Sequence, residues 1–209
     1  YEDIGNSLDQ FNKENLNTSL VRYYDGGSPT ALWAVRSLGI NPSDGRELFL
    51  TKEGTYTFEY DTEDEVVVGN SEPKLEGVLG STLYWKGFSF SLYFRYSLGA
   101  DVFTEATYNK VENISLAGLK SNQDKRALHD RWQKPGDHAK FKGISLTETT
   151  PISSRFVLRE NYIKAESISV GYDFESQAVQ KLGIQSLRLQ ANMTDLFRIS
   201  SIKEERGIE

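Results

Sequence analysis

The segment from Lys74 to Gly99 constrains the fold more than any other part of this 209-residue sequence. Up to Trp85 apolar residues stand at odd positions, Leu75, Leu79, Leu83 and Trp85, with Gly77 and Ser81 at the odd positions between them. After Lys86-Gly87 apolar residues occupy every even position. A period of two on both sides of a two-residue turn is typical of a tight antiparallel hairpin. We predict that one face of the second strand is apolar and carries Phe88, Phe90, Leu92, Phe94 and Tyr96. The other face should carry Ser89, Ser91, Tyr93 and Arg95.

A second alternating pair occupies residues 167–174 and 187–194, joined by the short polar stretch 175–185. If Phe174 lies opposite Leu187, then Asp173 lies opposite Arg188 on the polar face. Opposite charges that face each other across two strands help to fix the register. We therefore predict that Asp173 and Arg188 project from the same side of the sheet.

Periodicity alone leaves a soluble β-sandwich and a membrane barrel equally open. The long polar region 100–154 favours the barrel, because outer-membrane barrels combine short turns on one side with long loops on the other. No apolar run approaches the roughly 18 residues that a membrane-spanning helix needs, whereas barrel strands of about 10 residues need none. We predict an all-β fold: an antiparallel up-and-down transmembrane barrel segment of about four membrane strands with long extracellular loops.

The polar regions contain several weaker patterns. Residues 31–40 could form a helix or a strand, and the resemblance described below favours a strand. Residues 46–60 predict a hairpin that turns at Lys52-Glu53-Gly54. Ser7 to Gln10 has the form of a capping box before a short helix.

Asp124 could cap a second short helix that runs through Trp132 and ends at Pro135-Gly136. On that helix Leu128 and Trp132 are four residues apart, so we expect both to pack inward.

Composition excludes several classes of function. A net charge of −6 argues against nucleic-acid binding, and the absence of cysteine excludes disulfides, zinc–thiolate clusters and thiol nucleophiles. His129 and His138 lack the spacing of a zinc-protease motif, and residues 61–65 lack the pattern of an EF-hand loop. No glycine-rich phosphate loop or serine-hydrolase elbow occurs. We predict no catalytic residue, metal or cofactor, and no signal peptide at the start of the chain.

Five segments, taken in order, resemble the C-terminal barrel of the SusC/RagA family of TonB-dependent transporters. Residues 69–103 resemble the region with a Gly-Asn-x-x-Pro-Lys element, a Trp-Lys-Gly-Phe turn and an aromatic strand. Residues 124–144 are similar to the loop with an Arg-Trp-x-x-Pro-Gly-Asp core. The remaining segments are 33–50, with a Gly-Ile-Asn-Pro turn, 153–174, and 187–209, with an Asn-x-x-Asp-Leu-Phe element.

The resemblance implies a part of a 22-stranded outer-membrane importer of a Gram-negative, Bacteroidetes-like bacterium. The plug, the region that contacts TonB and the final strand would lie outside this chain. The expected division of the chain is 1–73 extracellular loop, 74–99 strand hairpin, 100–154 extracellular loop, 155–197 strand hairpin and 198–209 start of the last loop. Expected partners are a SusD-like surface lipoprotein, TonB, outer-membrane lipid, and an oligosaccharide or peptide cargo.

The resemblance also suggests roles for particular residues. The candidates for contact with cargo or partner are loop aromatics: Trp33, Phe49, Tyr23, Tyr24 and Trp132. Packing of these rings within the loops themselves is an equal alternative. Arg95, Asp173 and Arg188 should face the barrel lumen. A secreted carbohydrate-binding β-sandwich, or a structural sheet protein without a ligand, would instead bury the apolar strand face and behave as a monomer in buffer.

Overall fold

The computed structural model describes residues 2–145, 147–174, 183–184 and 186–202. These residues divide into two compact units. The loop unit comprises residues up to 72, residues 100–159 and residue 202, and the strand unit comprises residues 73–99 and 160–201. Each unit is described separately below.

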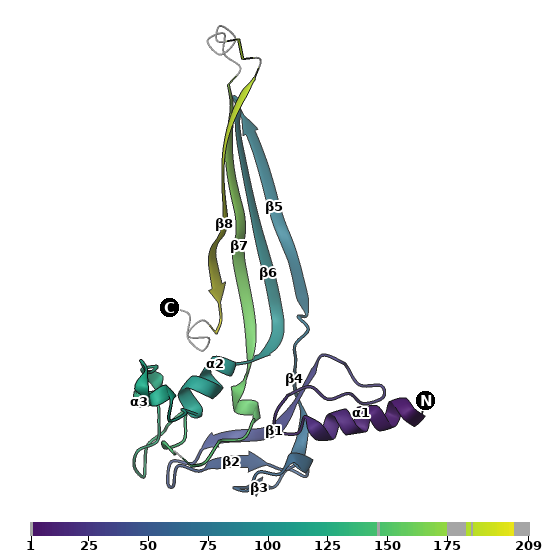
Figure 1. The fold of residues 1–209 in the computed structure, drawn as a ribbon, viewed down its shortest axis with the longest axis vertical. Helices are drawn as coiled ribbons and strands as arrows, with labels where there is room; N and C mark the ends of the chain where they lie inside the picture. The colour runs from purple at the N-terminus through teal and green to yellow at the C-terminus, as the bar shows by residue number, and fades with distance from the viewer. Residues whose placement is uncertain (1, 146, 175–182, 185, 203–209) are drawn as a thin grey trace. The chain divides into compact units, whose positions relative to one another are not determined.

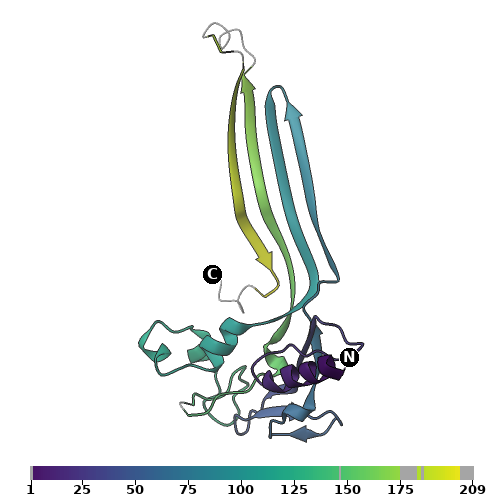
Figure 2. The same cartoon turned by 45° about the vertical axis from the view of Figure 1, so that its right-hand side comes forward.

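The strand unit is one antiparallel sheet whose order, β5-β6-β7-β8, follows the sequence (Figure 1). The strands are β5 (Leu75–Trp85), β6 (Phe88–Phe103), β7 (Val157–Phe174) and β8 (Leu187–Ser200), with β6 and β7 each extending a few residues into the loop unit. The rotated view in Figure 2 shows the same succession of four long strands. Such an up-and-down meander has two free edges, β5 and β8, within the described residues.

The first hairpin forms as the alternation predicts. β5 and β6 pair without interruption from Trp85 opposite Phe88 to Leu75 opposite Leu98. Lys86 and Gly87 both have positive φ, 47° and 85°, which is the backbone of the two-residue turn that matches strand twist. The uninterrupted register confirms that the apolar and polar side chains of β6 occupy opposite faces.

The second hairpin also has the predicted register, with Asp173 opposite Arg188 and Phe174 opposite Leu187. The predicted connection 175–185 lies almost entirely outside the described residues. An irregularity not predicted from the sequence occurs lower in the pair, where Ala165 faces Phe197 but Ser167 faces Thr194. Asp195 has a φ of 55° at this β-bulge. Between these two pairs β7 advances by two residues and β8 by three, so the extra residue lies in β8.

The apolar face of the strand unit is uncovered. Leu79, Leu83 and Leu189 are 60 %, 64 % and 69 % exposed. The buried apolar clusters lie instead in the loop unit: Leu20, Leu32, Ala34 and Ile152 form one, and Val111, Ala127, Phe141 and Phe156 form the other. A contiguous exposed apolar surface is unusual for a soluble monomer. No helix among the described residues is long and apolar enough to span a membrane.

The first part of the loop unit contains a small antiparallel sheet of order β3-β2-β1-β4. Its strands are β1 (Ala31–Ile40), β2 (Glu47–Leu50), β3 (Tyr56–Thr57) and β4 (Glu65–Asn70), with a 3-10 helix at Thr62–Asp64. This confirms the strand at 31–40 and the hairpin that turns at 52–54. Helix α1 (Glu2–Glu14) corrects one expectation, because it begins well before the predicted cap at Ser7.

Residues 104–156 form short helices and turns without a strand ladder. They are α2 (Glu105–Thr107), a π-helical turn at Tyr108–Glu112, a 3-10 helix at Gly118–Lys120, α3 (Arg126–His129) and a 3-10 helix at Ser154–Phe156. The Asp124 carboxylate accepts from the Arg126 N–H at 2.9 Å, but α3 ends three residues before Trp132. The expected inward packing of Leu128 is wrong: Leu128 is 64 % exposed, and its neighbour Ala127 is buried.

The register of the first hairpin can be tested by cross-linking. Thr82 lies opposite Ser91 on the polar face, with their hydroxyls 3.0 Å apart. We expect Thr82→Cys with Ser91→Cys to form a disulfide on mild oxidation, because directly opposed Cβ atoms lie within disulfide reach. Thr82→Cys with Phe90→Cys should not, since Phe90 projects from the other face. Mass spectrometry of the oxidised protein provides the measurement, and equal yields from the two pairs would contradict the register.

Candidate binding surface of the loop unit

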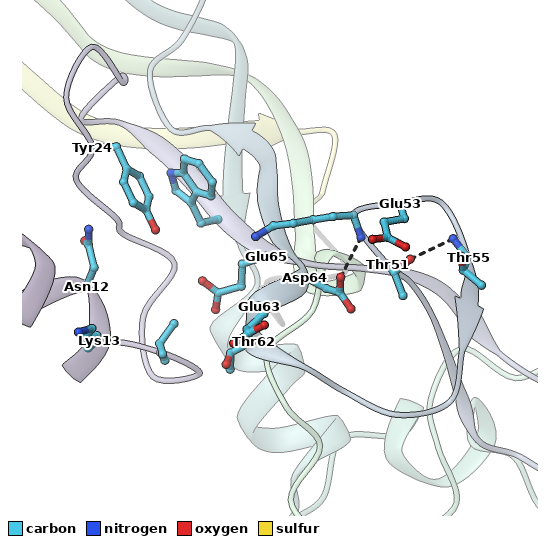
Figure 3. A pocket seen from close by; sticks show the side chains of 13 residues that line it. Asn12, Lys13, Tyr24, Thr51, Glu53, Thr55, Thr62, Glu63, Asp64 and Glu65 are labelled. Carbon is cyan, nitrogen blue, oxygen red and sulfur yellow. Dashed lines mark hydrogen bonds between the residues drawn. The ribbon is translucent and has the colours of Figure 1, made fainter.

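An open depression of about 1050 Å³ lies in the loop unit. Its lining comes from α1, the segment before β1, the β2–β3 turn and the start of β4. Figure 3 shows Tyr24 and Asn12 on one side of it, with Glu63, Asp64 and Glu53 across from them. The depression therefore depends on segments that are well separated in the sequence.

The aromatic part of the lining is the pair Tyr24 and Trp33. Their ring centroids are 4.9 Å apart, with the planes inclined at 54°. Tyr24 is 51 % exposed, whereas Trp33 lies on β1 and is half-buried. The structure thus brings together two of the five aromatic residues that the sequence singled out.

The charged part of the lining has both signs. Lys13, Lys52, Glu53 and Glu63 are exposed at its edge. The Asp64 carboxylate accepts from the Lys52 backbone N–H at 2.9 Å, which ties the β2–β3 turn to the 3-10 helix. No group of histidine and carboxylate side chains within the described part of the chain could hold a metal ion.

A buried ion pair supports the depression from beneath. Arg22 donates to both carboxylate oxygens of Glu65, at 2.8 and 2.9 Å, and its side chain is fully buried. Arg22 also donates to the carbonyls of Ser19 and Val21, so it fixes the segment that carries Tyr24. Burial, with the nearby Glu65 carboxylate, raises the pKa of the Tyr60 hydroxyl, which has no hydrogen-bond partner among the described residues.

Tyr23 and Phe49 do not join this lining. Tyr23 packs against Phe11 of α1, with centroids 5.3 Å apart, and is 38 % exposed. Phe49 is only 3 % exposed and meets Tyr60 edge-on at 5.5 Å. The ring of Phe49 therefore packs within the loop itself, which is the alternative to contact with a cargo or partner.

Trp132 joins two loops rather than presenting a free face. Its indole N–H donates to the Pro42 carbonyl at 2.9 Å. A Cβ placed on Gly45 would lie 2.5 Å from the indole ring, and the φ of Gly45 is 74°. Only glycine suits that backbone and that contact. The Arg-Trp-x-x-Pro-Gly-Asp motif therefore attaches residues 131–137 to the turn at 41–45.

A buried charge cluster, which the sequence analysis missed, holds the loop unit together. Arg155 bridges Glu47 at 3.0 Å and Glu112 at 2.9 Å, and both carboxylate side chains are almost completely buried. Ser153 donates to Glu47 at 2.6 Å, and Thr150 donates to Glu112 at 2.9 Å. Burial disfavours the charge of Arg155, but the hydrogen bonds with Glu112 and the charge of Glu47 outweigh it and raise its pKa. Three segments of chain thus meet at one guanidinium.

The π-helical turn explains how Glu112 reaches this cluster. Val111 and Glu112 are adjacent in sequence and both buried, the first fully and the second with 5 % exposure. Val111 belongs to the apolar cluster with Phe141 and Phe156, while Glu112 contacts Arg155. The wider π turn lets consecutive side chains point in these two directions. No sequence pattern signals such a turn.

The predicted lumen residues lie on the polar face of the strand unit. Arg188 makes two contacts with the Asp173 carboxylate, each of 2.5 Å, and Arg95 makes an ion pair with Glu166 at 2.9 Å. Ser169, Asn192 and Gln190 form a neutral hydrogen-bonded group beside them. The two arginines are exposed, the two carboxylates are partly exposed, and all four charges are paired, which suits a wet surface.

No family model matches the sequence. Two curated relatives are TonB-dependent receptors of Formosa agariphila. One is 24 % identical over 161 residues, covering 75 % of this chain and 15 % of the receptor. The other is 25 % identical over 174 residues, covering 83 % of this chain and 16 % of the receptor. The chain therefore spans about a sixth of the length of these relatives.

The fold is also similar to solved structures of the RagAB peptide importer. For the open-open state the TM-score is 0.68 with 16 % identity, covering 81 % of this chain and 19 % of the solved chain. For the closed-closed state the TM-score is 0.68 with 17 % identity, covering 83 % and 20 %. The chain thus resembles a fragment of a SusC/RagA-like TonB-dependent transporter, as its motifs predict. Its relatives are named as receptors and importers, not as enzymes.

The buried charge cluster leads to a prediction about stability. Arg155→Met should leave two buried carboxylates without a counter-charge and destabilise the loop unit by roughly 3–5 kcal/mol. Arg159→Met is a matched control, because Arg159 pairs with Asp101 at 3.3 Å but is 59 % exposed; its cost should be about 0–1 kcal/mol. Hydrogen exchange of residues 104–156, measured by mass spectrometry, reports the opening free energy. Equal protection in both variants would show that the cluster does not hold the unit together.

Proposed function

We propose that the chain is part of the barrel and outer loops of a TonB-dependent importer of SusC type in a Gram-negative outer membrane. It would take up oligosaccharides or peptides together with a SusD-like surface lipoprotein. The observation that carries the proposal is the strand unit, an antiparallel meander with a bare apolar face, a polar face and two free edges. In a barrel the apolar face meets lipid, the polar face lines the lumen and each free edge pairs with another strand.

The length of the apolar face fits a membrane. From Leu75 to Trp85 the chain makes ten steps along β5, or about 33 Å at roughly 3.3 Å per residue. Tilted by about 40°, such a strand spans about 25 Å, the height of the apolar band of an outer-membrane barrel. Four membrane strands, β5 to β8, would then cross the bilayer.

The turn end of the sheet has the character of a membrane interface. Phe88 and Tyr172 have ring centroids 4.5 Å apart, and Tyr172 and Phe174 have centroids 4.6 Å apart. Trp85 is 63 % exposed, and the Lys86 ammonium lies 5.2 Å from its ring centroid. Aromatic rings with a nearby cation are typical of the headgroup layer. The two-residue Lys86-Gly87 turn would be periplasmic, and the long segment 104–156, which follows the other end of β6, would be extracellular.

The similarity to the RagAB peptide importer supports a surface lipoprotein as partner and TonB as the energy source, the latter acting through parts of the protein beyond this chain. The candidate contacts are Tyr24 and Trp33, while Trp132 attaches the segment 131–137 to the turn at 41–45. Arg95, Asp173 and Arg188 would line the lumen. Rings of this kind stack on sugars and on apolar peptide side chains alike, so the proposal includes both cargo classes.

The alternative is a secreted carbohydrate-binding β-sandwich. It would need a second sheet packed over the apolar face, whereas the leucines of that face are mostly exposed. The exposure of these side chains therefore favours the barrel.

An arginine introduced on the apolar face distinguishes the membrane barrel from the secreted β-sandwich. Leu79 lies near the middle of β5 on the apolar face, and Thr82 lies on the polar face of the same strand. In the complete protein, Leu79→Arg should cost about 2–4 kcal/mol at mid-membrane depth and reduce assembly, while Thr82→Arg should assemble normally. Outer-membrane fractionation and heat-modifiable gel migration measure both. A protein that purifies without detergent, or two arginine variants that behave alike, would refute the membrane barrel.

Contact with the lipoprotein is tested at Tyr24. Tyr24→Ala should weaken binding of the lipoprotein to the purified complete transporter by at least fivefold, about 1 kcal/mol, if this ring is part of the interface. Tyr56→Ala is the control, because Tyr56 is also an exposed tyrosine of the loop unit, at 69 %, but does not line the depression. Surface plasmon resonance gives the affinities. Unchanged affinity in Tyr24→Ala would exclude the depression from the interface without affecting the barrel assignment.

A further inference from the structure

A second depression in the loop unit, of about 410 Å³, gathers basic side chains from one turn of chain. Its lining includes His129, Lys134, His138 and Lys140, and Arg131 belongs to the same lining. The two histidines, which are nine residues apart in the sequence and show no metal-binding spacing, are brought to the same depression here. We call this the basic depression.

The backbone around the basic depression is fixed by hydrogen bonds. The Lys140 and Phe141 N–H groups donate to the Asp130 carbonyl at 3.0 and 3.1 Å, and the Trp132 N–H donates to the Phe141 carbonyl at 3.0 Å. These bonds hold the two sides of the turn together, so the backbone that carries the basic side chains has a fixed conformation. A preorganised frame lowers the entropic cost of binding a small ligand.

Of the two acidic residues in the lining, one is already engaged. The Asp137 carboxylate accepts from the backbone N–H groups of Gln133 and Lys134 at 3.1 and 3.0 Å. Its charge is thereby partly neutralised, and it serves as a cap for the turn. The negative charge of the other acidic residue, Asp130, is outnumbered by the positive charges of the two exposed lysines, Lys134 and Lys140, and of the buried Arg131.

Arg131 adds a positive charge that is incompletely satisfied. It is 5 % exposed and donates to the carbonyls of Lys142, Glu112 and Val111. Its Nε–H has no hydrogen-bond partner within the described part of the chain. Burial and the neighbouring Arg155 lower the pKa of this guanidinium, and the Glu112 carboxylate offsets them only in part, because Glu112 is itself bridged to Arg155. A negative charge brought into the depression would therefore stabilise Arg131 as well as the lysines.

We propose that the basic depression binds a carboxylate group of an extended ligand. Lys134 and Lys140 supply the charge, and His129 and His138 supply further N–H donors. The carboxylate could be the C-terminus of a peptide or the uronate of an acidic sugar, which present the same chemistry. This inference concerns the loop unit alone and does not require that the protein transport anything.

The test uses the complete purified protein and four probes: triglycine, triglycinamide, a trisaccharide of galacturonic acid and its neutral galactose counterpart. Saturation-transfer NMR titration gives the affinity of each probe. At least one of the two carboxylate probes should bind, and its neutral counterpart should not bind. Which carboxylate probe binds more tightly identifies the source of the group.

Two lysine pairs provide the matched variants. Lys134→Gln with Lys140→Gln should weaken the binding of the carboxylate probe by roughly two- to thirtyfold, the range expected for two solvent-screened ion pairs. Lys110→Gln with Lys120→Gln removes the same charge from exposed positions of the same unit and should have no effect. Both pairs lie on the surface, so the melting temperature should not change.

Three results would overturn the inference: equal binding of a carboxylate probe and its neutral counterpart, equal effects of the two lysine pairs, or no binding of either acidic probe. None of these results would bear on the barrel, whose test is the assembly of the arginine variants of β5. Failure of that assembly test would likewise leave the carboxylate site standing.

Discussion

The bridge from Arg155 to Glu47 and Glu112 is the interaction on which the loop unit depends. A loop unit made of short helices and a small sheet has limited apolar area to bury, so a central ionic contact can decide which segments meet. Such a buried cluster contributes little net stability, because desolvation offsets most of the attraction. Its effect is specificity, since any other arrangement would leave a buried charge without its partner. The exposed ring of Tyr24 is positioned by a second buried ion pair, between Arg22 and Glu65.

The strand unit follows a different principle. Its hairpins are specified by local pattern and turn geometry, and the leucines of its apolar face stay mostly exposed within the unit. They need an apolar environment, while the paired charges of the opposite face need water. A sheet with such faces is stable between lipid and an aqueous lumen, and it is a liability in free solution.

The strands were predictable because a period of two is read directly from the sequence, as from Phe88 to Tyr96, and because Lys86-Gly87 determines the register. The bulge at Asp195 was not predicted, although the alternation of β8 is interrupted there by a polar residue at an odd position, Asp195, and an apolar one at an even position, Leu196. The candidate site was predictable only in part. Aromatic residues could be named, but Phe49 is buried and Tyr24 is exposed for reasons of tertiary contact. Pairing of Arg155 with carboxylates 43 and 108 residues away leaves no local signal.

The loop unit is interrupted twice in sequence, and the two ends of its first gap, residues 73–99, are adjacent. The Asn70 N–H donates to the Asp101 carboxylate at 3.0 Å, and the backbone of Gly69 lies against the same side chain. The β5–β6 hairpin therefore leaves and re-enters this unit at nearly one point, as an inserted domain does in its host. A host that closes on itself in this way does not need the inserted hairpin to complete its own contacts. The loop unit and the strand unit can thus diverge in evolution as separate modules, with variation in one leaving the hydrogen-bonded geometry of the other intact.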